Sequence, residues 1–151
     1  MRIRELVMVT GALAMLAGCA TAGGGGGAGR AQDSVRRQLQ NATAIARGRG
    51  YAVAASTPAT GALNDGGSEY VGVTLNAGRE YLMVGVCDGD CTDMDLRLFS
   101  PGGNEIARDV AVDDTPVLQF VAPTSGNYRV RVEMADCNVN PCYYGVALYA
   151  R

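Results

Sequence analysis

Residues 70–87 read YVGVTLNAGREYLMVGVC and contain two alternating apolar patterns on either side of a short polar segment. In its first six residues every second side chain is apolar, so one face carries Val71, Val73 and Leu75. Asn76–Gly78 has the composition of a turn. After the turn the alternation resumes over residues 80–87, where one face carries Leu82, Val84 and Val86. The stretch therefore predicts two short β-strands joined by a turn.

The same pattern recurs on both sides of this stretch. Further short β-segments are predicted at 95–100, 106–108, 117–121, 128–134 and 143–149, with weaker ones at 51–56 and 61–63. Turns rich in Gly and Pro separate them, for example Pro101–Asn104 and Pro123–Gly126. No helical periodicity interrupts the series, which makes a parallel βαβ fold unfavourable. The fold class expected is mainly β, an antiparallel β-sandwich.

The order of strands and turns resembles a known family, the bacterial pre-peptidase C-terminal (PPC) domain. The residues that carry the resemblance are Val73–Leu82, Asp93–Gly103, Phe120–Val132 and the closing strand Tyr144–Leu148. It covers about residues 68–151 and implies a jelly-roll-like sandwich over residues 52–151. Members of that family are appended to secreted proteases. Here no protease precedes the module within these 151 residues and four cysteines are added, so the accessory role does not carry over.

The first nineteen residues have the pattern of an export signal. Two arginines precede the apolar run Leu6–Ala17, which is too short to cross a bilayer because that takes roughly 18 or more residues. The run ends in Leu16-Ala-Gly-Cys19, which resembles the lipobox of bacterial lipoproteins. The resemblance implies a signal peptide at 1–18 and acylation, such as palmitate, on Cys19. Ala20 then favours the outer membrane. The alternative is an ordinary secretory signal with a chance cysteine.

Between this signal and the β-segments lie a glycine-rich stretch and one helix. Residues 19–32 predict a flexible linker. Residues 33–48 predict an amphipathic helix, with Asp33 or Ser34 as N-cap and Gly48 as C-cap. Its apolar face carries Val35, Leu39, Ala42, Ile45 and Ala46. We favour packing of this face on the sandwich over binding to a partner or a membrane surface, because the apolar stripe is narrow and lacks aromatic anchors.

Four further cysteines form two local pairs. They are Cys87, Cys91, Cys137 and Cys142. An exported chain meets an oxidising compartment, so disulfides are expected. Four cysteines allow three connectivities, and we favour the two local ones, each closing a loop at the end of a strand. A zinc site is the competing interpretation, and the absence of other soft ligands disfavours it.

Aspartates gather near the first cysteine pair. Four lie within residues 88–95, and two more follow at Asp113 and Asp114. Carboxylates that converge in this way favour Ca²⁺, so the hypothetical site consists of Asp93, Asp95, Asp113 and Asp114. The spacing is not that of an EF-hand. The alternative is a solvated acidic loop whose aspartates cap turns. A glycosidase pair of carboxylates is disfavoured, because the chain is short and contains no Trp.

Composition limits the possible functions. The chain has no His, and all 13 of its basic residues are Arg. This excludes Ser-His-Asp and Cys-His catalysis and any His-ligated metal. Residues 30–50 carry five Arg and one Asp, a net +4, whereas residues 65–151 carry thirteen acids and six Arg, a net −7. The acidic domain and its export argue against nucleic-acid binding.

The sequence therefore predicts a non-catalytic lipoprotein of the cell envelope that displays a small β-sandwich as a binding or structural module. Membrane lipid would hold it through Cys19, and an envelope protein or a glycan would be its partner. The alternative is a carbohydrate- or peptidoglycan-binding module, with or without a requirement for calcium. An enzyme is the third class, and no pair of nucleophile and base supports it. No catalytic residue is assigned.

Overall fold

The computed structural model describes residues 26–54 and 58–151, so the predicted signal peptide and Cys19 lie outside the described residues. The described part contains one helix and nine strands. Their bounds are α1 Gly26–Gly48, β1 Ala52–Val53, β2 Ala59–Leu63, β3 Ser68–Leu75, β4 Glu80–Cys87, β5 Cys91–Phe99, β6 Glu105–Asp109, β7 Val117–Val121, β8 Gly126–Cys137 and β9 Cys142–Ala150. Every strand pairing is antiparallel, which confirms the predicted mainly-β sandwich.

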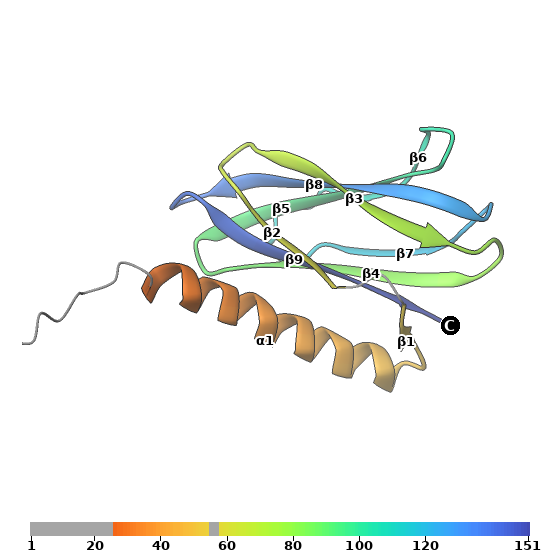
Figure 1. Cartoon of the computed structure of the whole chain (residues 1–151), viewed down its shortest axis with the longest axis horizontal. Coiled ribbons are helices and arrows are strands. Elements are labelled where there is room, and N and C mark those ends of the chain that lie inside the picture. Colours follow the sequence, from red (N-terminus) through yellow and green to blue (C-terminus); the bar gives the residue numbers. More distant parts are fainter. Residues whose placement is uncertain (1–25, 55–57) are drawn as a thin grey trace, which may run out of the picture.

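The strands form two sheets that pack face to face, with α1 lying outside one of them (Figure 1). Sheet A contains β1 and β2 beside β9, followed by β4 and β7. Sheet B has the order β3-β8-β5-β6. The two strands predicted within residues 70–87 therefore belong to different sheets: β3 pairs with β8, and β4 lies between β9 and β7. The turn at Asn76–Gly78 carries the chain from one layer to the other.

The core between the sheets comes from alternate residues of both layers. Sheet B contributes Val73, Leu75, Met94, Leu96, Leu98, Tyr128, Val130, Val132 and Met134, and sheet A contributes Tyr81, Met83, Leu118, Tyr144, Val146 and Leu148. In β4 the side chains of Leu82, Val84 and Val86 share one face, as predicted. That face points away from the core between the sheets and toward α1. Strand β4 is thus buried on both faces, and so is most of β9.

The helix packs on sheet A through a small second core. Its buried side chains are Val35, Leu39 and Ala46, which pack with Leu82, Val84, Val86, Ala147 and Tyr149. Gly145 on β9 allows the approach, because a Cβ there would lie 2.7 Å from Leu39 Cδ1 and 2.9 Å from Val35 Cγ1. The helix therefore packs its buried apolar side chains against the sandwich, which is the arrangement that the sequence analysis favoured.

Polar contacts fix the helix along its length. Near its middle, the Gln38 Nε2 donates to the Cys87 carbonyl at 2.6 Å. One and a half turns further on, the hydroxyls of Thr43 and Tyr149 are hydrogen-bonded at 3.0 Å. These bonds set the register of the helix against β4 and β9, which apolar contacts alone specify poorly.

Both ends of the helix differ from the sequence expectation. It begins at Gly26, so residues 26–32 of the predicted linker are helical. Glycine is a poor helix former, but residues that extend an existing helix avoid the cost of nucleation. At the other end Gly50, with φ of 85°, takes the left-handed position, and the helix runs through Gly48. The bonds Tyr51 N–H to Ala46 O and Gly50 N–H to Arg47 O form a Schellman motif.

Substituting Gly145→Ala tests the close approach of the helix. The added Cβ meets Leu39 and Val35, so we expect the free energy of unfolding to fall by about 1–3 kcal/mol, the usual cost of overpacking. Urea denaturation of the full chain measures it. The matched control is Gly72→Ala on β3, where a Cβ has nothing within 4 Å and we expect a change within about 0.5 kcal/mol. Equal effects of the two substitutions would contradict the tight contact.

Candidate functional site

The predicted cysteine pairs lie together at one end of the sandwich. The structure joins Cys87 to Cys91 and Cys137 to Cys142, with Cα–Cα distances of 6.0 Å and 5.9 Å, which is the predicted pairing. Cys91 and Cys137 are directly opposite each other on β5 and β8. All four side chains are buried, so the disulfides act as part of the core at this end. Two short closed loops restrain it where the strands part.

The fold brings only some of the four aspartates of the calcium hypothesis close together. Asp93 and Asp95 lie on β5 and face Asp136 and Glu133 of β8 across the sheet. Asp113 lies in the β6–β7 loop, close enough for its charge to act on Asp93. The Asp114 carboxylate instead accepts the Thr115 hydroxyl at 2.9 Å. Within residues 26–54 and 58–151 no group of three or more acidic, Cys or His side chains is arranged to hold a metal ion.

Several of the aspartates serve the backbone of their own loops. The buried Asp88 accepts the amides of Asp90 at 3.1 Å and Tyr143 at 2.8 Å. Asp109 accepts the amides of Ala111 and Val117, and Asp113 accepts that of Thr115 at 2.9 Å. These are the turn-capping roles considered as the alternative to calcium. The calcium site remains a hypothesis from the sequence without support from this geometry.

Asp93 and Asp95 lie in an environment that disfavours their charge. Burial is the main cause that raises the pKa of Asp93, and the charges of Asp113 and Asp136 add to it, against a lowering hydrogen bond with the Asp113 backbone. The pKa of Asp95 is raised by burial first and then by the charges of Asp93 and Glu133. Asp93 Oδ1 is buried and has no hydrogen-bond partner among the described residues. These carboxylates therefore weaken the fold at neutral pH.

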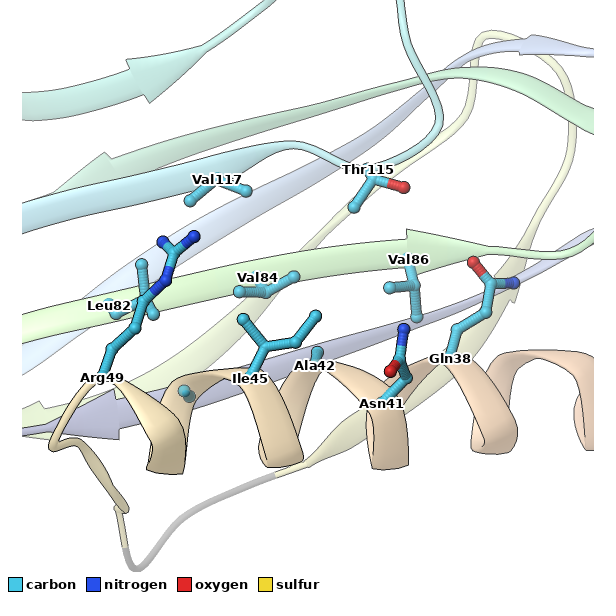
Figure 2. Close-up of a pocket in the computed structure, with 11 residues that line it drawn as sticks. Gln38, Asn41, Ala42, Ile45, Arg49, Leu82, Val84, Val86, Thr115 and Val117 are labelled. Carbon is cyan, nitrogen blue, oxygen red and sulfur yellow. The ribbon is translucent and has the colours of Figure 1, made fainter.

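A groove of about 290 Å³ runs between α1 and the β4–β7 half of sheet A (Figure 2). Its floor consists of Leu82, Val84 and Val86, and its walls include Ala42, Ile45, Thr115 and Val117. Ile45 is 50% exposed and Val117 is 44% exposed, because the helix covers β9 and leaves the β7 side open. Gln38, Asn41 and Arg49 supply polar atoms at the rim. The groove offers apolar packing and hydrogen bonds, and its lining contains no carboxylate or thiol for catalysis.

Glu80 holds together the end of sheet A that lies under the helix C-terminus. Its Oε1 accepts the Tyr51 hydroxyl and the Gln119 amide, each at 2.7 Å, and its Oε2 accepts Arg151 Nε at 2.8 Å. The Arg151 guanidinium also lies 4.8 Å from the centre of the Tyr51 ring. The hydrogen bonds from Arg151, Tyr51 and Gln119 lower the pKa of Glu80 to about 2. Sequence reasoning missed this network, because its partners are separated by up to 71 residues.

Comparison with known proteins assigns no family to this chain. The chain matches no protein-family model and no curated protein sequence. Among solved structures it is similar to the crystal structure of Aeromonas hydrophila PliG, a periplasmic lysozyme inhibitor of g-type lysozyme. The identity is 17%, the TM-score is 0.47, and the match covers 63% of this chain and 85% of that chain. A likeness at this level carries no inference about function.

The helix does not resemble a membrane span. Within the described ranges, no helix is both long enough and apolar enough to cross a bilayer.

Neutralising Glu80 tests its network and its pH dependence. Because the pKa of Glu80 is lowered, its stabilising effect is present above the ordinary value of about 4.5 and is lost as the pH falls toward 2. We expect Glu80→Gln to lower the melting temperature at pH 7, with the difference from the wild type narrowing between pH 5 and pH 2. Asp90→Asn, on an exposed loop, is the control. A gap that stays constant with pH would contradict the assignment.

Neutralising Asp93 should have the opposite effect. A raised pKa means that stability is greatest below the ordinary value and is lost as the pH rises through the folded-state value. We expect Asp93→Asn to raise the melting temperature at pH 7 in chelator, with a smaller gain at pH 3. Asp90→Asn serves again as control. A lower melting temperature at pH 7 would contradict the expectation.

The same melting curves test the calcium hypothesis. If Asp93, Asp95, Asp113 and Asp114 bind the ion, millimolar calcium raises the melting temperature of the wild type and Asp93→Asn removes that rise. No calcium shift in the wild type would end the hypothesis.

Proposed function

We propose that this protein is a non-catalytic lipoprotein of the bacterial cell envelope that presents a helix-backed β-sandwich as a binding module. In this proposal Cys19 carries the acyl chains, the residues that follow it form the tether, and residues 26–151 form the displayed module. Three acyl chains exceed the two anchoring signals that stable membrane attachment requires. The proposed location is the outer membrane, because the residue that follows Cys19 is Ala20.

The observation that carries the proposal is the docking of α1. Its apolar side chains pack on sheet A, and Gln38 and Thr43 bond to β4 and β9. The helix therefore keeps little apolar surface for a bilayer, apart from Ile45 at the edge of the groove. This docking supports the proposal that membrane attachment comes from the segment before Gly26, where the sequence has the lipobox-like residues.

The described residues also support a role in binding. The groove lining lacks an acid–base pair, and the buried Asp88 is occupied by backbone amides. Two surfaces are available for a partner: the groove beside α1, and the outer face of sheet B. We further propose a distant relation of residues 68–151 to the PPC domain. Its motifs fall on the β3–β4 turn, on β5 with the turn after it, and on the β7–β8 turn.

Cys19→Ala tests the anchor, in a chain whose signal peptide remains cleavable, so that export continues and the apolar segment is removed. We expect the wild type to stay with the membranes through high salt and an alkaline wash, and the variant to be soluble. A variant that remains bound in high salt would contradict lipid anchoring at Cys19.

A control separates the lipid from the basic helix. If the Cys19→Ala variant binds membranes at low salt only, the helix arginines act as a second anchor. Adding Arg36→Gln and Arg37→Gln, which lie on the exposed side of α1, should then release it. Such a release would show that α1 contacts lipid in spite of its docking on the sandwich.

A further inference from the structure

The outer face of sheet B carries a row of arginines that runs across the strands. Arg131 on β8 is directly opposite Arg97 on β5, and Arg97 is directly opposite Arg108 on β6. On the other side of Arg131 the same row ends at Tyr70 of β3. We call Arg131, Arg97 and Arg108 the arginine row. No described element covers this face, since α1 lies on the far side of sheet A (Figure 1).

Such a row opposes the stability of the sheet. Like charges directly opposite on neighbouring strands are destabilising, and here three stand side by side. Two carboxylates compensate them: Glu105 contacts Arg97 at 3.3 Å and Arg108 at 3.7 Å, and Glu133 contacts Arg131 at 3.1 Å. Arg97 Nε is buried and has no hydrogen-bond partner among the described residues. With two carboxylates against three arginines, the row keeps a net charge of +1.

An exposed aromatic group stands at one end of the row. Tyr70 is 54% exposed, and Phe99 packs against it edge-on with the ring centroids 6.1 Å apart. Arg129 lies 5.2 Å from the centre of the Tyr70 ring and makes no ion pair with any carboxylate in the described part of the chain. A tyrosine beside the unpaired guanidinium group of Arg129 suits a ligand that has both apolar C–H surface and negative charge, as a sugar acid does.

Acidic residues limit the shape of that ligand. The next row of the sheet contains Glu133 opposite Asp95, and beyond it Asp93 is opposite Asp136. Successive rows on one face are about 7 Å apart, so these acids repel any broad anionic surface, such as a bilayer, that approaches the arginines. A narrow anionic chain that lies along the row keeps clear of Asp93, Asp95 and Asp136, and it competes with Glu133 for Arg131 alone. The module as a whole carries −7 over residues 65–151, so general attraction of polyanions is also unfavourable.

The spacing of the row indicates the repeat of the ligand. Neighbouring strands are about 4.8 Å apart, so the backbone positions of the three arginines recur at about that interval. This is comparable to the length of one pyranose ring in a linear polysaccharide. A polymer with one carboxylate on each sugar therefore places successive charges on successive strands, and Arg can bind each carboxylate through two hydrogen bonds.

We propose that the outer face of sheet B binds a linear acidic polysaccharide, with carboxylates on the arginine row and on Arg129 and a sugar ring against Tyr70. The inference deepens the proposed function, because it rests on the module being a binding module and names its ligand. Its test is carried out in solution and does not depend on the lipid, so that binding and anchoring can fail separately.

The experiment is a calorimetric titration of the full chain with polygalacturonate oligomers. The protein is purified from the cell fraction in which it is found. The fully methyl-esterified oligomers, which lack the charge, are the control probe and should not bind. The variant Arg108→Gln with Arg129→Gln removes two exposed arginines from the face. We expect it to weaken binding by about tenfold or more, since each lost charge-assisted hydrogen bond contributes more than a neutral one. Tyr70→Ala should weaken binding severalfold.

The matched control is Arg36→Gln with Arg37→Gln on α1, which changes the net charge equally on the opposite side of the molecule. We expect its affinity to stay within about twofold of the wild type, since charges beyond about one Debye length, roughly 8 Å, are screened. Equal weakening by the two double variants would overturn the proposal in favour of general charge attraction. No binding of the charged oligomers by the wild type would also overturn it. So would binding to phosphatidylglycerol vesicles that the oligomers do not displace.

Discussion

At Gly145 the helix lies so near sheet A that a single added carbon would be 2.7 Å from Leu39. This close approach brings Val35, Leu39 and Ala46 onto β4 and β9, and it explains why those two strands are buried on both faces. A strand that is buried on both faces needs apolar side chains on both, which residues 81–87 supply. The same approach places the helix over β9, so the β7 side of sheet A remains open as the groove. Sheet B is left as the layer with an uncovered outer face.

Much of the fold could be predicted because its signals are local. Alternation located β3, β7, β8 and most of β9 to within a few residues, and Gly or Pro turns marked where they end. The helix began seven residues before the expected Asp33, since glycines that are unfavourable by propensity still extend a helix that tertiary contacts have already formed. Sheet membership was not predictable. The turn at Asn76–Gly78 looks the same whether it joins neighbours or carries the chain between layers.

In the candidate site, too, the features that depend on nearby residues were predictable and those that depend on residues distant in the sequence were not. The disulfides could be predicted because each closes a loop of a few residues, so no partner from elsewhere in the chain had to be known. The aspartates resembled a metal cluster in sequence, but Asp109 and Asp113 accept amides two residues ahead of themselves. Glu80 and Arg97 gave no signal at all. Their significance depends on Arg151 and on Arg131, and only the strand register brings those residues alongside.

The arrangement of charge gives the two sides of the molecule different roles. The basic residues of α1 lie behind sheet A, on the side where the chain enters from the proposed anchor, while sheet B opens in the opposite direction. If a membrane lies on the helix side, exposed arginines of α1 such as Arg37 contact its head groups. The net charge of −7 over residues 65–151 opposes a closer approach of the sandwich to anionic lipid. The outer face of sheet B is then held away from the lipid and is accessible to the acidic polysaccharide proposed as its ligand. On that face the opposed side chains of Arg131, Arg97 and Arg108 are unfavourable for the sheet, and Glu105 and Glu133 compensate them only in part. A ligand that binds the remaining charge would therefore stabilise the folded state.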